Sequence, residues 1–169
     1  DNKAMAEKVR LLRDHGQKTK TEILCFGFNS RLDNLQAAVL NVKFQYLPGW
    51  IRRRRGIAKL YHQGLVKIPE IKLPPPPDSD SQRFDIFQNY VIRAERRDEL
   101  FLFLKERGVE TLIKDPVPNH WQKGLNLSHF RLPNTEKFAK EIISLPMYPE
   151  LTNRQIEYVI DCLKEFYVT

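Results

Sequence analysis

The stretch GFNSRLDNLQAA, residues 27–38, leads from a glycine and an asparagine into a strongly patterned helix. Asp33 followed by Gln36 has the spacing of an N-cap whose partner amide reaches back, and Ser30 is a competing cap. Apolar residues then recur every three or four positions and draw one stripe along a helix predicted over about residues 33–47: Leu32, Leu35, Val39, Val42 and Tyr46.

Asn29 stands beside this helix start, where backbone N–H groups lack partners inside the helix. Such donors, together with a side-chain amide, suit a phosphate or a carboxylate. The other interpretation is structural, with Gly27 and Asn29 as ordinary turn residues. The pattern of residues alone leaves both interpretations open.

Length and composition favour a globular protein. The chain has 169 residues and is 41% hydrophobic, which suits one domain with a modest core rather than a disordered chain. No apolar run approaches the roughly 20 residues that span a bilayer, and no secretory pattern opens the sequence, so a cytoplasmic location is expected. Because the chain opens on Asp1 inside a helical pattern, we expect a fragment or a processed chain.

The formal net charge of +7 favours polyanionic partners in general. The densest basic run is Arg52–Arg55, and four consecutive residues wrap all round a helix instead of forming one face. We expect a mainly solvated run with some stems packed on apolar neighbours. Nucleic acid is therefore not an expected partner.

Metal binding is also not expected. Cys25 and Cys162 lie far apart without metal-ligand spacing, and the four histidines show no ligand grouping. Two buried or half-buried free thiols in a cytosolic protein explain the cysteines better than a disulfide.

The first third of the chain is predicted to be helical with short connections. A helix over 3–15 ends at Gly16, a polar loop follows, and an apolar run ends in a turn at Gly27. Pro48-Gly49 should break or kink the long helix, and a second helical pattern runs from Ile51 to Gly64.

The rest of the chain is predicted to form a small α/β layer structure. A stiff proline-rich connector at 73–77 precedes alternating strand and helix patterns. The predicted elements are a strand at 87–94, helices at 96–107, 133–145 and after 152, and a short strand at 109–113.

An irregular segment at 115–129 separates these elements. Loops of this length in a compact chain are usually functional or disordered. Lys114, His120 and Trp121 make it a candidate binding loop. The alternative is that Trp121 only pins the loop to the core.

Several motifs, in order, resemble one enzyme family. LRDHGQ (12–17) and GFNSRLDNLQAAVL (27–40) are followed by QNYVIRAERRDEL (88–100), PVPNHWQK (116–123), LPNTEK (132–137) and SLPMYPELTNRQIEYVI (144–160). Together they resemble the DegT/DnrJ/EryC1/StrS family of sugar aminotransferases, fold-type I enzymes that use pyridoxal 5'-phosphate. The resemblance covers nearly the whole chain.

The resemblance implies a division of the chain into three parts. Residues 1–32 would be the tail of the large cofactor domain, 33–66 a long interdomain helix region, and 67–169 a small C-terminal α/β domain. The implied fold class is α/β, with a long helix and a small, mostly antiparallel sheet flanked by helices. No segment resembles the family's lysine that forms the Schiff base with the cofactor, so no catalytic residue is assigned and the isolated chain is expected to be inactive.

The resemblance also implies roles for four residues. Asn29 matches the family's asparagine that reaches the cofactor phosphate across a homodimer interface, and Arg31 is carried along by position. Lys114 and His120 fall on the substrate-side loop, where a nucleotide-linked keto-sugar would bind. Many members have a histidine–tyrosine pair where this chain has Lys114-Asp115, so the identity of the substrate stays open.

The resemblance implies a transamination in two half-reactions. The first takes an amino group from glutamate or glutamine, and the second passes it to the keto-sugar. Two other interpretations remain. The chain could be a non-enzymatic basic binding domain, on the strength of its charge, or a dimerisation domain whose long helix packs on a second copy.

Overall fold

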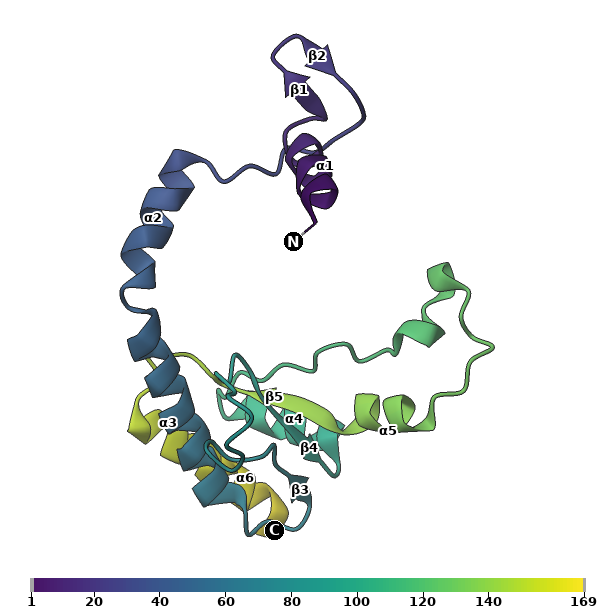
Figure 1. Cartoon of the computed structure of the whole chain (residues 1–169). Helices are drawn as coiled ribbons and strands as arrows, with labels where there is room; N and C mark the ends of the chain where they lie inside the picture. The colour runs from purple at the N-terminus through teal and green to yellow at the C-terminus, as the bar shows by residue number, and fades with distance from the viewer. Residues whose placement is uncertain (1, 169) are drawn as a thin grey trace. The chain divides into compact units, whose positions relative to one another are not determined.

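The computed structural model describes residues 2–168, which form two compact units. The first unit ends at Leu47 and the second begins at Pro48 (Figure 1). Each unit is described by itself below. The three-part division of the chain remains a prediction.

The first unit begins with helix α1 (Lys3–Arg13), whose N-cap Asn2 accepts a hydrogen bond from the Met5 N–H at 3.0 Å. A small antiparallel hairpin follows, formed by β1 (Gln17–Thr19) and β2 (Glu22–Ile23). We expected a polar loop here, and this prediction was wrong. Thr19 and Glu22 pair across a two-residue connection, so backbone pairing holds the segment without an apolar face.

Helix α2 (Asn34–Phe44) begins where the sequence predicted, with Asp33 as N-cap and Gln36 completing the capping box. It ends at Phe44, three residues earlier than expected. Helix α3 (Leu47–Leu65) starts before Pro48, which lies in its first turn. Proline lacks an N–H that the first turn does not need, so the break falls at residues 45–46 rather than at the proline itself.

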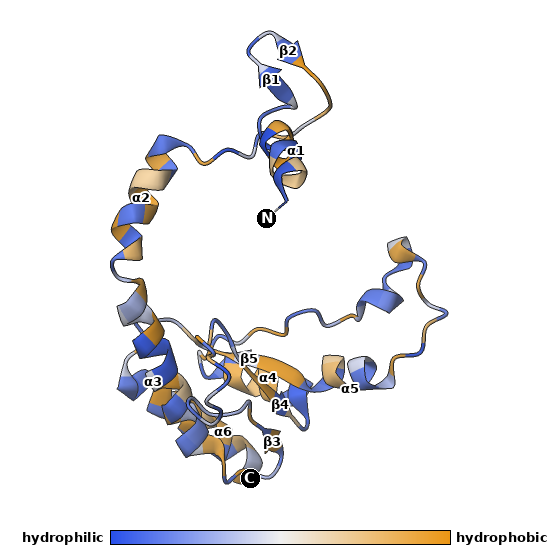
Figure 2. Ribbon diagram, viewed as in Figure 1, coloured by the Kyte–Doolittle hydropathy of each residue, from blue (hydrophilic) through white to orange (hydrophobic). Residues whose placement is uncertain are grey.

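None of the buried apolar residues of the structure lies between residues 2 and 47. The five residues of the stripe predicted along the helix at 33–47 are exposed, with Leu35 79% and Val42 59% accessible, and two of them, Leu32 and Tyr46, lie outside α2. Figure 2 shows this mixture of apolar and polar residues along α2. The first unit therefore lacks a core of its own.

The second unit is built on a three-stranded antiparallel sheet in the order β3–β4–β5. The strands are β3 (Ile71–Lys72), β4 (Tyr90–Ala94) and β5 (Ile142–Leu145). Tyr90 pairs with Leu145 in the β4–β5 ladder. The predicted fold class is confirmed: a long helix and a small antiparallel sheet flanked by helices.

Two predicted elements near this sheet were wrong. The segment at 109–113 forms only one bridge, between Leu112 and Ser144, instead of a strand. Helix α5 (Pro133–Glu141) stops at Glu141, and the four residues predicted to continue it form β5. These residues gain paired backbone groups along β4 while burying Ile143 and Leu145, and that tertiary gain outweighs the helical pattern.

Two helices cover the sheet region. Helix α4 (Arg97–Glu106) and helix α6 (Asn153–Val168) contact each other, and Thr152 with Gln155 caps α6 as predicted. The core joins α3, the sheet, α4 and α6 (Figures 1 and 2). Its largest fully buried side chains are Tyr61, Tyr90, Ile57, Leu65, Ile92, Leu100, Leu104, Ile143, Ile156 and Leu163.

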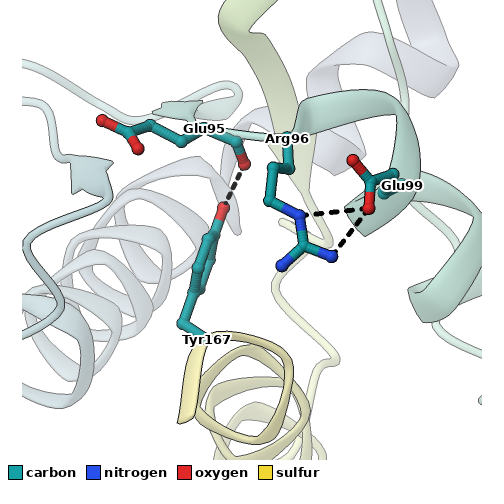
Figure 3. Close-up of polar contacts among 4 residues, drawn as sticks. All are labelled: Glu95, Arg96, Glu99 and Tyr167. Carbon is teal, nitrogen blue, oxygen red and sulfur yellow. Dashed lines mark hydrogen bonds and ion pairs between the residues drawn. The ribbon is translucent and has the colours of Figure 1, made fainter. Parts of the chain in front are cut away.

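The end of α6 is tied to the turn between β4 and α4 (Figure 3). The Tyr167 hydroxyl donates to the Glu95 carbonyl oxygen at 2.7 Å, and burial raises the pKa of Tyr167. Arg96 adopts a left-handed backbone conformation, φ +52°, and its guanidinium donates to the Glu99 carboxylate at 2.7 and 3.0 Å. These contacts fix the turn against the last helix.

The arginine run on α3 is mostly not solvated, which corrects our expectation. Arg54 donates to the carbonyl oxygens of Phe87, Gln88 and Met147 at 2.8–3.2 Å. Arg53 and Arg55 make further contacts to other loops, with Leu151, Asn153, Asp78 and Asp85. Arg52 is exposed, whereas Arg53, Arg54 and Arg55 are half-buried and donate to backbone carbonyl oxygens and side chains of neighbouring segments.

Candidate functional site

The segment that carries Asn29 lies against the end of α1. The Phe28 N–H donates to the Leu12 carbonyl oxygen at 2.7 Å, and the His15 N–H donates to the Phe28 carbonyl oxygen at 2.9 Å. The Ser30 N–H donates to the Arg13 carbonyl oxygen at 2.8 Å. These bonds fix the backbone on both sides of Asn29.

Two glycines allow this close packing. A Cβ on Gly27 would lie 2.2 Å from the Gly16 nitrogen, and a Cβ on Gly16 would lie 1.8 Å from the Cys25 carbonyl oxygen. Gly16 also has φ +72°, whereas Gly27 has no positive φ. Gly27 is therefore required by the approach of two backbone segments, which corrects our expectation of a turn glycine.

Asn29 itself is exposed, and its backbone forms an isolated antiparallel bridge with Asp14. Arg31 lies nearby, with its Nε 3.6 Å from an Asp14 carboxylate oxygen and its side chain half exposed. Both predicted cofactor residues thus come from one backbone segment and share one acidic neighbour. Asp14 was not singled out from the sequence, because only the fold brings it to this segment.

A pocket of about 380 Å³ opens beside this segment. Arg31 lines it but Asn29 does not, and the full lining is Arg13, Asp14, Arg31, Leu32, Asp33 and Asn34. Two arginines and the start of α2 can hold an anion there, although two aspartates oppose them. The residues described around this pocket include no lysine, so they fit the phosphate of a cofactor but supply no amine for its aldehyde.

The predicted substrate residues lie in the second unit and differ in environment. Lys114 is exposed. His120 lies in the short 3-10 turn η1 (Asn119–Trp121), with only 4% of its surface accessible. Its Nε2 lies 3.1 Å from the Glu136 Oε1, and its ring lies 5.5 Å from the ring of Trp121. The structure therefore presents Lys114 to solvent and holds His120 against α5.

Trp121 is 44% exposed, so His120 rather than Trp121 fixes this loop. The sequence analysis missed Glu136 as the partner. Glu136 is the acidic residue of LPNTEK and lies in the first turn of α5, four residues after Leu132. An acidic residue at this position is a sequence signal for capping. Its contact with His120, sixteen residues away, had no local signal.

Cys25 and Cys162 are both free thiols. Cys162 is buried as expected, but Cys25 is exposed. Between residues 2 and 168, no group of three or more histidine, cysteine or acidic side chains could hold a metal ion. No helix in this described part of the chain combines the length and apolar character needed to cross a membrane.

Comparison with known proteins decides the family. Residues 1–164 match the model of the DegT/DnrJ/EryC1/StrS aminotransferase family. The chain belongs to this family. The resemblance found in the sequence motifs is thus confirmed.

Two relatives and one solved structure define what the chain is similar to. It is 43% identical to a "Pleiotropic regulatory protein" of Geobacillus stearothermophilus over 96% of the chain and 44% of that protein. It is 39% identical to the dTDP-3-amino-3,4,6-trideoxy-alpha-D-glucose transaminase of Streptomyces venezuelae over 96% of the chain and 43% of that protein. The crystal structure of NtdA from Bacillus subtilis with bound cofactor PMP superposes with a TM-score of 0.88 at 26% identity, over 100% of the chain and 41% of NtdA. The chain therefore spans less than half the length of these family members.

Proposed function

We propose that this chain is the C-terminal part of a pyridoxal 5'-phosphate-dependent aminotransferase that acts on a nucleotide-linked keto-sugar. Membership of the aminotransferase family supports this proposal, as do the sugar transaminase of Streptomyces venezuelae and the PMP bound to NtdA. The amino donor would be glutamate or glutamine. The proposed location is the cytoplasm, where two unpaired thiols are commonly found.

The observation that carries the proposal is the exposed Asn29 on a fixed backbone segment. Its amide can donate to a phosphate without placing a second full charge beside Asp14. We assign Asn29 to the cofactor phosphate of the partner subunit in a homodimer. Arg31, held loosely by Asp14, would add electrostatic attraction to the same phosphate.

The cofactor supplies the electron sink for amino transfer when it is bound. This chain would hold the phosphate and leave proton transfer to a lysine outside the pocket described here. The isolated chain would therefore not transaminate. Lys114 would contact the diphosphate or a carboxylate of the substrate, because its ammonium group is exposed and is not paired in the described residues.

The activity can be tested in a protein that joins this chain to the remaining length found in the relatives. With pyridoxal phosphate and glutamate, we expect amino transfer to a dTDP- or UDP-linked keto-sugar. Lys114→Met should raise the KM for the nucleotide sugar more than it lowers kcat, since exposed Lys114 would bind rather than react. Lys123→Met, at an exposed lysine of the same loop, is the control. Absence of transfer to every nucleotide keto-sugar would contradict the proposal.

One observation favours a second candidate, a dimerisation domain without catalytic function. Helix α2 exposes several large apolar side chains, among them Leu35, Val39 and Leu40, and a second copy could cover them. Two measurements together separate the candidates. The second function is favoured if sedimentation shows that the isolated chain is a stable dimer and the complete protein does not bind pyridoxal phosphate.

A further inference from the structure

Residues 114–131 form a mainly exposed loop in the second unit, here called the 114–131 loop. Its own backbone hydrogen bonds are local, such as the Trp121 N–H to the Pro118 carbonyl oxygen at 2.9 Å and the Phe130 N–H to the Leu127 carbonyl oxygen at 3.1 Å. Within it only Pro118 and His120 are buried. A loop with so few buried contacts needs a specific anchor if it is to keep one position.

The Glu136 carboxylate supplies that anchor. Its Oε1 accepts a hydrogen bond from the Leu132 N–H at 3.0 Å and lies 3.1 Å from the His120 Nε2. One oxygen therefore joins the middle of the loop to the point where the loop enters α5. Among the hydrogen bonds and ion pairs of residues 2–168, His120–Glu136 is the polar side-chain contact between the 114–131 loop and another element.

Helix α5 is in turn fixed to the sheet. The Arg93 guanidinium of β4 donates to the Glu141 carboxylate at 2.8 Å and lies 4.3 Å from the centroid of the Phe138 ring. Ala139 on the same helix is buried. Glu136 and α5 therefore link the position of His120 to strand β4.

We propose that His120 and Glu136 form a latch that positions the 114–131 loop, with Glu136 as a positioning residue that no sequence motif assigned. His120 acts through this latch instead of contacting the substrate, because its ring is buried and its Nε2 is already occupied. The latch also sets where Lys114 lies relative to α5. Only the consequence of this position for substrate binding rests on the proposed function.

The charges around the latch are consistent with a carboxylate acceptor. Hydrogen bonds from the Leu132 N–H and from His120 lower the pKa of Glu136, and Lys140 on the next turn of α5 acts in the same direction. Glu136 is thus ionised at neutral pH and can only accept hydrogen bonds, so the contact requires a proton on the His120 Nε2.

Tryptic cleavage of the whole chain at pH 7, mapped by mass spectrometry, tests the latch. The loop offers Lys123 as an exposed cleavage site. Glu136→Ala should raise cleavage after Lys123 by about five-fold or more, because it removes the hydrogen bonds to His120 and to the Leu132 N–H, and loss of about 1 kcal/mol already changes the open population by that factor. Glu136→Gln should restore slow cleavage, because its amide oxygen can still accept from both donors. Glu157→Ala, at an exposed glutamate of α6, is the matched control.

A spectroscopic signature accompanies cleavage. Trp50 and Trp121 are the two tryptophans of the chain, so Trp50→Phe leaves Trp121 alone beside His120. In that background Glu136→Ala should shift the Trp121 emission, and Glu136→Gln should not. Cleavage and emission in Glu136→Ala that match the parent protein would overturn the latch, as would a Glu136→Gln variant that behaves like Glu136→Ala.

This test uses neither cofactor nor nucleotide sugar. A failed latch therefore leaves the proposed aminotransferase function unaffected, and a failed aminotransferase assay leaves the latch unaffected. If Glu136→Ala does not fold, His120→Ala gives a second route, since it removes the Nε2 donor while leaving the Leu132–Glu136 bond in place. Its loop should be cleaved as fast as expected for Glu136→Ala, and cleavage at the parent rate would contradict the latch.

Discussion

Single glycines show how tightly the second unit is packed. Gly64 faces Ile160 of α6, and a Cβ placed on Gly64 would lie 2.6 Å from the Ile160 Cδ1 and 2.8 Å from its Cγ2. Gly56, on the same helix, has nothing within 4 Å of its position for a Cβ. Two identical substitutions on one helix therefore have opposite expected effects.

Gly64→Ala should lower the free energy of unfolding by about 1–3 kcal/mol, because the new methyl group overpacks the contact with Ile160. Gly56→Ala should raise it by about 0.5–1 kcal/mol, because alanine favours a helix interior and meets no neighbour. Urea unfolding followed by far-UV circular dichroism measures both. Equal effects of the two variants would contradict the packing of α3 on α6.

Glu136 gives a dependence on pH at the same scale. Its folded-state pKa lies below the ordinary value of 4.5. The stabilisation that it contributes is fully present above about pH 4.5 and is lost as the pH falls through the lowered pKa. The difference in unfolding free energy between the parent protein and Glu136→Gln should therefore shrink below pH 4.5. A difference that grows on acidification would reverse the sign and refute the assignment.

Residues with local partners could be predicted from the sequence. Asp33 and Gln36 cap α2, and Thr152 and Gln155 cap α6, because each pair lies three residues apart. Asn29 could be chosen as a site residue only through the family resemblance. The reason for Gly27 could not be read, because its neighbour Gly16 is distant in sequence and its φ is unremarkable.

At the scale of elements, α3 owes its position to arginine side chains as well as to its apolar face. Arg54 bridges the loop before β4 and the loop after β5 through three carbonyl oxygens, at the end of the sheet where Tyr90 pairs with Leu145. The helix thus organises the loops that precede β4 and follow β5.

Arg54→Met should lower the free energy of unfolding by about 1–3 kcal/mol, since partly buried carbonyl oxygens lose a charged donor. Arg52→Met, at the exposed neighbour, should change it by less than about 0.5 kcal/mol. Thermal and urea unfolding of the two variants supply the comparison. If both variants lose equal stability, the arginine run acts through net charge instead of specific contacts.

Helices and strands could be predicted from the sequence where the apolar residues repeat regularly over a long segment. In short segments the same residues fit either a helix or a strand. Helices α1, α2, α4 and α6 follow their apolar spacing, and α2 and α6 also follow their predicted caps. Residues 142–145 read as a continuation of α5 because four residues are too few to separate the two periods. Pairing with β4, which is about fifty residues away in sequence, decides that they form a strand.

For the molecule as a whole, the two units differ in what stabilises them. The buried apolar residues lie between Ile57 and Phe166, whereas Phe26 and Phe28 in the first unit are 101% and 70% exposed. Helices of eleven residues such as α1 and α2 are marginal in water without packing. The first unit therefore needs a covering surface, which the proposed complete aminotransferase would provide.

Hydrogen–deuterium exchange of the isolated chain tests this difference. Amides of α3, β4 and α6 should exchange slowly, because they belong to the element set that carries the core. Amides of α1 and α2 should exchange at least about ten-fold faster. Protection of α2 equal to that of α3 would show that the first unit is stable by itself.

The family resemblance predicted the fold class that the structure confirms, whereas the cofactor half-site that it implies stays a prediction. Composition alone could not predict the fold class. A net charge of +7 suggested a basic surface, but three of the four arginines at 52–55 bind neighbouring segments of the same unit instead. The charge of the run is directed at loops of the same unit.

The affinity of the complete protein for pyridoxal phosphate tests the central proposal most directly. In a protein that joins this chain to the remaining length of the relatives, Asn29→Ala should weaken binding of the cofactor about ten-fold or more, as expected for loss of a hydrogen bond to a charged group. Asn41→Ala, at an exposed asparagine of α2, should leave the affinity unchanged. Equal affinity in the Asn29→Ala variant and the parent protein would show that Asn29 does not hold the cofactor phosphate.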